Sequence, residues 1–205
     1  MTEAKIIRLP ETSEPAETVD GRKMRSERSR QQIITAMLDL VREGDMNPSA
    51  ASVAERAGVG LRTVFRHFED MDTLYQEIAG YIEGIVLPKV VTPFQSRHWR
   101  GRLEELVKRR ASIYEEIMPF RVVANLRRFV SSYLMDNYRR SMLLERAALK
   151  SILPEAIHED KVLFAALELT TGFQSWRRLR QDQGLSPAEA EAVMALMALQ
   201  LVEGK

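Results

Sequence analysis

Hydrophobic and polar residues recur along the chain at the three- and four-residue spacing of helices, and the clearest run begins at Ser29. Its apolar face is formed by residues of similar size: Ile33, Ile34, Met37, Leu38 and Val41. Arg42 and Gly44 mark the end of this helix. No long segment alternates with the two-residue period of a strand. The pattern therefore predicts an all-α chain of about nine helices.

Further helices are expected up to Pro88. Ser49 is a suitable N-cap for a helix over 50–57. A longer helix can be capped by Asp70 or Asp72, and Pro88 is expected to end it because proline cannot continue the hydrogen-bond ladder.

The second half of the chain shows the same helical spacing. It resumes over 103–114, breaks at Pro119 and resumes over 122–129. Another helix is expected over 132–153.

The last two helices are expected over about 161–182 and 187–203. Each contains a stretch that is apolar on nearly every side: 162–169, where only Glu168 is polar, and 193–202, where only Gln200 is polar. Ser186 and Glu189 form a capping box at the start of the second one. A helix that is apolar all round must be buried all round, so we expect these two helices to form a homodimer seam. The alternative is one central helix in a monomeric core.

Residues 61–69 place apolar and polar side chains on opposite sides of a short helix. The side chains expected to need a core are Leu61, Val64, Phe65 and Phe68. The polar face comprises Arg62, Thr63, Arg66 and His67.

The segment before this short helix supplies the features of a tight turn. Ala54 is small enough for close helix crossing, and Gly58 can adopt the left-handed conformation that a tight turn needs. Val59 and Val64 can then pack between the two helices. This spacing predicts a helix-turn-helix unit whose second helix enters the DNA major groove. The alternative is an ordinary helical hairpin with solvated arginines.

Charge is unevenly distributed, although the 205-residue chain has a formal net charge of only +1. Residues 11–20 hold four acidic residues and no basic one, whereas 22–30 hold five basic residues against one acidic residue. We expect a flexible acidic tail over 1–21, then a domain over 22–87 comprising a basic arm, the helix-turn-helix and a linking helix, and a second domain over 88–205. By itself, the basic block also fits a solvated helix start.

The stretch AERAGVGLRTVFRHFEDMDTLY resembles the N-terminal domain of TetR-family transcriptional regulators. The matching residues are Ala57, Gly58, Val59, Thr63, His67, Phe68 and Leu74. The resemblance is strong over about 25–87 and extends weakly to the end of the chain, where FQSWRRLRQDQGLSPAEA is similar to the closing helices of many members. The chain departs from the family pattern at Gly60, Phe65 and Met71, where serine, tyrosine and lysine are usual.

With this resemblance, a set of residues in the first domain is expected to contact double-stranded operator DNA: Arg22, Lys23, Arg25, Ser49, Ser52, Gly60, Leu61, Arg62, Thr63, Phe65, Arg66 and His67. Because Phe65 and Met71 remove two phosphate contacts that are usual in the family, we expect Arg62 and Arg66 to supply replacements.

The resemblance also implies a small-molecule effector site among the middle helices, with Phe173 and Trp176 near its floor. Aromatic side chains suit the walls of such a site, although each also suits a plain core. The expected pocket residues are Trp99, Tyr114, Phe120, Phe129, Tyr133, Phe173 and Trp176. Arg121, Arg127 and Arg128 could meet an anionic group, but surface positions are expected for them.

Other classes of protein find little support. The chain has no cysteine, which excludes disulfides and thiolate metal sites. Its histidines, His67, His98 and His158, are far apart in sequence, so neither a metal nor any other cofactor is expected. No nucleophile or acid–base set of an enzyme, no phosphate loop, no signal peptide and no membrane-spanning run is recognisable.

The sequence thus predicts a cytoplasmic homodimeric DNA-binding regulator, a repressor that a small-molecule effector releases from a palindromic operator. The alternatives are a helical ligand-binding or protein-interaction module that no longer reads specific DNA, and a helical enzyme.

Overall fold

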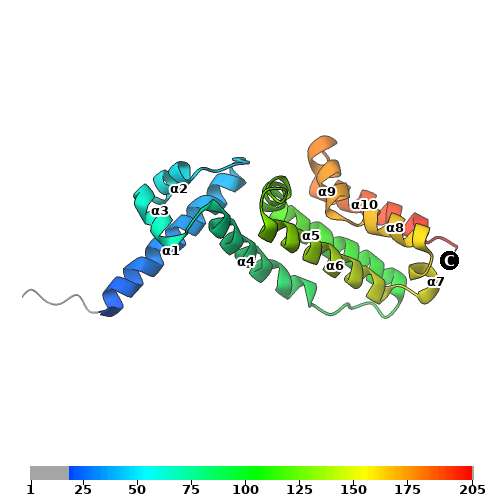
Figure 1. Ribbon diagram of the computed structural model, residues 1–205. Coiled ribbons are helices and arrows are strands. Elements are labelled where there is room, and N and C mark those ends of the chain that lie inside the picture. The colour runs from blue at the N-terminus through cyan, green and yellow to red at the C-terminus, as the bar shows by residue number, and fades with distance from the viewer. Residues whose placement is uncertain (1–18, 205) are drawn as a thin grey trace, which may run out of the picture.

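The computed structural model describes residues 19–204, and this part of the chain contains only helices and connecting segments (Figure 1). Ten α-helices and one π-helical turn occur within it, which confirms the all-α prediction of about nine helices. The helices are α1 (Val19–Arg42), α2 (Ala50–Ala57), α3 (Leu61–His67), α4 (Met71–Val90), α5 (Trp99–Arg127), α6 (Ser132–Ile152), α7 (Glu155–His158), α8 (Lys161–Thr170), α9 (Phe173–Arg177), the π-turn η1 (Arg178–Asp182) and α10 (Pro187–Leu201).

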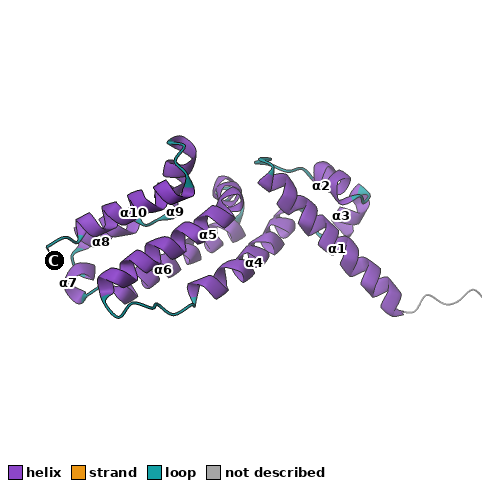
Figure 2. Ribbon diagram, turned by 180° about the vertical axis from the view of Figure 1, so that it is seen from behind, coloured by secondary structure: helices purple, strands orange, loops and turns teal. Residues whose placement is uncertain are grey.

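Helices α1, α2 and α3 with the first half of α4 form a head at one end of the molecule (Figures 1 and 2). They share a core in which Ile33, Met37 and Val53 are fully buried. Phe120 of α5 and Leu134 of α6 complete this core. The head is therefore packed directly against the remaining helices.

The remaining helices form a body around α5, which packs against α6, α9 and α10. Its core contains the fully buried Leu103, Leu149 and Met194 together with Trp176. Helix α4 leaves the head and runs along α5 and α6, so one continuous helix connects the two parts (Figure 1).

Helix α1 begins at Val19, ten residues earlier than the hydrophobic pattern predicts. The basic residues over 22–30 are therefore helical rather than an extended arm. Arginine, lysine, methionine and glutamate are good helix formers, and this segment lacks apolar periodicity because residues 22–28 are exposed and belong to neither core. The expected acidic tail lies outside the described residues except for its last three residues, which are helical.

The predicted helix break at Pro119 is wrong, because α5 continues through it. Tyr114 and Ile117 before the proline, and Phe120 and Val123 after it, are all buried. Their burial outweighs the hydrogen bond that proline cannot donate.

Pro88 likewise does not end α4, which continues to Val90. Carbonyl groups near this end have other donors. The Thr92 hydroxyl donates to Pro88 O at 2.9 Å, and Arg109 Nη1 donates to Val90 O at 3.1 Å.

The single helix expected over 161–182 is interrupted at Thr171 and Gly172. The Thr171 hydroxyl donates to Leu167 O at 2.8 Å, and a Cβ on Gly172 would lie only 3.0 Å from Glu168 O. Arg110 of α5 donates to the carbonyl and hydroxyl oxygens of Thr171. The break in the helix at Thr171 thus coincides with a contact from α5, which the periodicity of the local sequence does not show.

The capping box at Ser186 is confirmed, with both reciprocal hydrogen bonds present. Helix α10 buries one stripe and leaves Leu196 61% exposed, so it is not a central helix of a monomeric core. On α8, Val162 and Leu169 are also exposed. These helices therefore carry uncovered apolar side chains in the single chain.

Candidate nucleic-acid interface and ligand cavity

The turn between α2 and α3 is built as the sequence predicts. Gly58 adopts the left-handed conformation with φ of 66°, and Val59 N donates to Ala54 O at 3.0 Å. Ser49 and Ser52 form a reciprocal capping box at the start of α2. Their hydroxyls are thus already engaged in hydrogen bonds within the chain.

Helix α3 buries a narrower face than its apolar pattern suggests. Val64 and Phe68 are 1% and 2% exposed and belong to the head core, whereas Leu61 and Phe65 are 47% and 48% exposed. The expectation that Leu61 and Phe65 need a core is therefore wrong. The helix is only seven residues long, so one side chain per turn suffices to attach it to α1 and α2.

Arg62 and Arg66 are exposed on the outer side of α3. Within residues 19–204, neither makes a hydrogen bond or an ion pair. In contrast, Arg56 of α2 donates to both carboxylate oxygens of Glu43, at 2.7 and 2.5 Å. The two α3 arginines are therefore available for an external anion, whereas Arg56 has a structural partner.

The side chain of His67 is partly buried, and its Nε2 atom has no hydrogen-bond partner in the described part of the chain. Burial, followed by the charges of Arg66 and Arg30, lowers the pKa of His67 below its ordinary value of 6.5. The imidazole is therefore uncharged at neutral pH and resembles a core group more than a phosphate-binding cation.

The basic residues of α1 lie beside the head on an exposed helix. Arg22, Lys23, Arg25 and Arg28 are all exposed, and Arg25 Nε donates to Gly21 O at 3.3 Å. Further along α1, the Arg30 guanidinium pairs with Glu77 of α4 at 2.6 Å. Positive charge thus extends from α3 to the first turns of α1.

The three departures from the family pattern have different structural consequences. Gly60 is the N-cap of α3 and supplies no side-chain acceptor. Phe65 is exposed, whereas Met71 is partly buried and packs against the head core. Of the three, only Phe65 therefore presents an exposed side chain to a partner, while Gly60 is exposed but can offer only its backbone.

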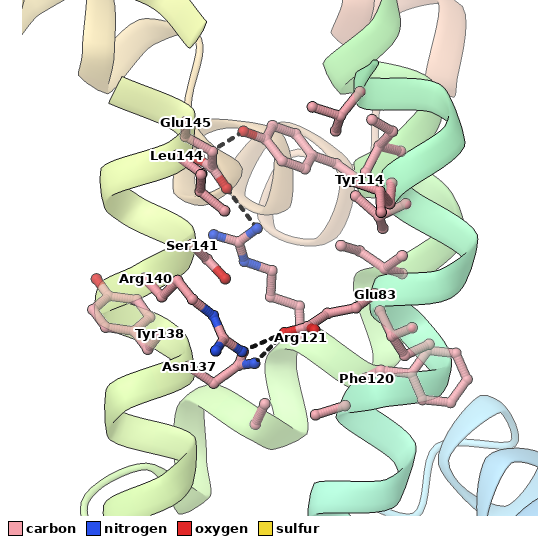
Figure 3. A pocket seen from close by; sticks show the side chains of 18 of the residues that line it. Glu83, Tyr114, Phe120, Arg121, Asn137, Tyr138, Arg140, Ser141, Leu144 and Glu145 are labelled. Carbon is pink, nitrogen blue, oxygen red and sulfur yellow. Dashed lines mark hydrogen bonds and ion pairs between the residues drawn. The ribbon is translucent and has the colours of Figure 1, made fainter. Parts of the chain in front are cut away.

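A cavity of about 740 Å³ lies between α4, α5 and α6 (Figure 3). Most of its wall is apolar, with Ile82 and Val86 from α4 and Ile113 and Ile117 from α5. Its size lies within the usual range for small-molecule sites. Met37 and Val41 of α1 and Tyr75 of α4 line the same cavity, so it reaches the core of the head.

Only some of the expected pocket residues line a cavity. Tyr114 and Phe120 line the large cavity, and Phe173 lines a smaller neighbouring one of about 270 Å³. The other expected residues lie outside both linings: Trp99, Phe129, Tyr133 and Trp176. Trp176 is buried in the body core and its indole N–H donates to Glu115 at 3.2 Å, while Phe129 is 72% exposed after α5.

A charged cluster at the boundary of the two cavities was not recognisable in the sequence. Glu145 of α6 accepts a hydrogen bond from the Tyr114 hydroxyl at 2.9 Å and pairs with Arg121 at 2.6 Å (Figure 3). Burial, as the largest cause, raises the pKa of the Tyr114 phenol, which therefore stays protonated. The surface position expected for Arg121 is wrong, because its side chain is only 14% exposed.

A second polar bridge crosses the cavity nearer the head. Glu83 of α4 accepts hydrogen bonds from Asn137 at 2.8 Å and from Arg140 at 2.5 Å, both on α6 (Figure 3). It joins the helix that connects the head to the body with the opposite wall of the cavity.

One arginine also joins the end of α5 to the head. Arg127 Nη1 donates to Asn47 Oδ1 at 2.8 Å, and its guanidinium lies 4.4 Å from the centre of the Tyr75 ring. Because Tyr75 lines the cavity, this contact connects the cavity wall with the loop before α2.

Two further searches of residues 19–204 concern other kinds of site. This part of the chain holds no group of three or more acidic or histidine side chains arranged to bind a metal ion. None of its helices combines the length and the hydropathy that crossing a membrane requires.

Comparison with solved structures finds a protein with a similar fold. The chain superposes on a Mesorhizobium loti protein described as a candidate TetR-family transcriptional regulator, with a TM-score of 0.59 and 18% sequence identity over 87% of this chain and 96% of that one. No family model matches the sequence, and no curated protein matches it significantly. The shared fold agrees with the TetR resemblance seen in residues 57–74.

Proposed function

We propose that the protein is a homodimeric DNA-binding transcriptional regulator, and specifically a repressor that a small-molecule effector releases from a palindromic operator. The main support for this proposal is the set of exposed side chains on the outer side of α3. Arg62 and Arg66 are exposed there and have no hydrogen-bond or ion-pair partner among residues 19–204, on a helix that Val64 and Phe68 attach to the head. In a helix-turn-helix protein this is the side that enters the major groove.

The side chains on this surface suit both base and backbone contacts. Arg62 and Arg66 can donate to guanine edges or to phosphates. The exposed Leu61 and Phe65 lie one turn apart and are suited to contact the methyl groups of thymine. The exposed basic residues of α1 add phosphate contacts that depend on salt concentration.

The uncovered apolar side chains of α8 and α10 support association of two copies. Val162, Leu169 and Leu196 are each more than 60% exposed. Helices from two subunits packed together would remove them from water as a four-helix bundle does. Two α3 helices about 34–36 Å apart would then read a palindrome.

The position of the large cavity supports regulation by an effector. Its wall includes Met37 and Val41 of α1 and Tyr75 of α4, which belong to the core that carries α3. An effector that binds better to a conformation with the wrong spacing of α3 helices would favour release of DNA, by no more than its difference in affinity for the two conformations.

Selection of bound sequences from a random DNA pool tests the proposal most directly. We expect enrichment of a palindrome with half-sites one helical turn apart, and light scattering at micromolar concentration should show a dimer. A strict monomer would contradict the proposed seam.

The alternative is a ligand-binding or interaction module that no longer reads specific DNA. Phe65 and Met71 favour it, because neither supplies the phosphate contact that is usual in the family at its position. A selection that enriches no sequence, together with weak binding that salt abolishes, would support this alternative.

A further inference from the structure

The structure also bears on the chemical class of the effector, and this inference rests on the proposed effector cavity. Four arginines and two carboxylates line the large cavity: Arg109, Arg110, Arg121, Arg140, Glu83 and Glu145. The excess positive charge is set in a wall that is otherwise mostly apolar.

Arg110 is the clearest source of this excess. It is 5% exposed, and its hydrogen-bond acceptors are all neutral: the hydroxyl and carbonyl oxygens of Thr171 and the backbone carbonyl of Glu145. No carboxylate within residues 19–204 forms an ion pair with it. A buried cation without an anionic partner is costly, so a nearby anion is favoured.

Arg121, like Arg110, contacts residue Glu145, and within residues 19–204 Glu145 is its one ion-pair partner. Its guanidinium pairs with Glu145 and lies 4.9 Å from the centre of the Phe173 ring. Tyr114 donates to the other carboxylate oxygen of Glu145. The carboxylate of Glu145 thus holds the donors that a ligand carboxylate would use.

The other two arginines need an added anion less. Arg140 pairs with Glu83 nearer the head. Arg109 stacks 4.2 Å from the centre of the Phe94 ring and donates to a backbone carbonyl, and because it is only partly buried, water can solvate its charge. This leaves Arg110 and Arg121 as the polar end of an apolar space.

We propose that the effector is an amphipathic anion, a carboxylate on an extended apolar body. The body lies along the apolar wall between α4 and α5, and the carboxylate replaces that of Glu145 on Arg121 and the Tyr114 hydroxyl, next to Arg110. A cationic ligand, which Glu83 and Glu145 would attract, is the opposite possibility that the experiment must separate.

Calorimetric titration of the full chain with three probes tests this inference: decanoate, decanol and decyltrimethylammonium, each below its micellar concentration. They share one alkyl chain and differ in head group. We expect decanoate to bind at least about tenfold more tightly than the other two, because hydrogen bonds to a charged group are added. Equal binding of the three, tighter binding of the cation, or no binding of any probe would overturn the proposal.

Two substitutions in the cluster sharpen the test. Glu145→Gln removes the competing carboxylate at nearly constant volume, so we expect decanoate to bind severalfold more tightly. Arg121→Gln should weaken decanoate about tenfold without changing decanol binding. A merely structural role of Glu145 would weaken binding in Glu145→Gln, and this outcome would contradict the proposal even if Arg121→Gln does not fold.

DNA binding by the ligand-free protein separates this inference from the proposed function. If the protein binds no specific DNA but prefers decanoate, the regulator proposal fails and the anion site stands. If it binds specific DNA but prefers the cationic probe, the anion site fails and the regulator proposal stands.

Discussion

The outer side of α3 and the cavity in the body use arginine in opposite ways. Arg62 and Arg66 are exposed and make no hydrogen bond or ion pair in the described part of the chain, whereas Arg110 and Arg121 are largely buried and bonded to other helices. Charges in water are screened by salt, and buried charges are screened far less. We therefore expect the arginines of α3 to determine binding to an external partner. The arginines of the cavity should instead determine the stability of the fold and the charge of the ligand that the cavity accepts.

The largest expected effect is on DNA affinity. Substituting Arg62→Ala and Arg66→Ala together removes two cations, each worth about 1–3 kcal/mol if it contacts a base. We expect affinity for the selected site to fall at least about 30-fold and the salt dependence to become shallower by up to about two counterions. The free energy of unfolding should change by less than about 0.5 kcal/mol, because neither side chain has a hydrogen-bond or ion-pair partner in the described part of the chain.

Fluorescence anisotropy across salt concentrations measures this change. Arg97→Ala with Lys108→Ala is the matched control, since it removes two exposed cations outside the head. Wild-type affinity with an unchanged salt dependence in the Arg62, Arg66 variant would show that α3 does not contact DNA.

Arg110→Met should do the opposite of the α3 substitutions and change the stability of the protein. The substitution leaves three acceptors without their arginine donor, the hydroxyl and carbonyl oxygens of Thr171 and the carbonyl of Glu145, at about 1–3 kcal/mol each. Removing the unpaired buried charge offsets part of this cost, so we expect a net loss of about 1–3 kcal/mol in the free energy of unfolding. Urea unfolding measures the loss, and the exposed Lys108→Met serves as control. Unchanged stability would mean that Arg110 has no structural role, and the contrast between the two regions would disappear.

Phe65 tests whether the exposed apolar side chains of α3 contribute to sequence reading. We expect Phe65→Ala to weaken binding roughly fourfold, since one methyl-sized apolar contact is worth about 0.8 kcal/mol. Phe129→Ala removes another exposed phenylalanine, one that lies outside the head, and should have no effect on DNA binding. The loss should vanish on DNA in which uracil replaces thymine, and its persistence there would assign Phe65 another role.

His67 shares features of both regions: it lies on α3, as Arg62 and Arg66 do, but it is partly buried. The pKa of His67 in the folded protein is lower than the ordinary value of 6.5, which applies to the unfolded chain. At pH values between these two pKa values the unfolded chain binds more protons than the folded protein, so stability falls as the pH decreases. Wild-type protein should thus lose more stability than His67→Gln when the pH is lowered from about 7.5 to 5.5. Equal losses in thermal melts would show that burial of His67 does not disfavour its charged form.

Local signals in the sequence predicted the turn and the caps correctly, because they act within a few residues. Gly58 and Ser49 are examples. The break at Thr171 and the passage of α5 through Pro119 depend on contacts from distant helices, which periodicity does not show. Leu61 was placed in the core because a helical wheel cannot tell how much of an apolar face neighbouring helices cover.

The proposed DNA-contacting surface was easier to predict from the sequence than the cavity. Most of its candidate residues, over 60–67, are neighbours in sequence on or directly before one short helix, and the others lie on α1 and at the start of α2. The charged cluster of the cavity combines Arg110, Arg121 and Glu145 from two helices, and each of them alone looks like an ordinary surface residue. Only the packing of α5 against α6 brings them together.

Gly60 offers the smallest and most local test. It is the N-cap of α3 without a side-chain acceptor, and a Cβ added there would meet no atom within 4 Å. Its φ of −71° suits any residue, so Gly60→Ser should accept the hydrogen bond of an α3 amide and raise the free energy of unfolding by a few tenths of a kcal/mol. Gly60→Ala, which adds the Cβ without the hydroxyl, is the matched control in urea unfolding. If the alanine variant is as stable as the serine variant, the gain comes from a less flexible unfolded chain and not from a cap on the helix that carries Arg62 and Arg66.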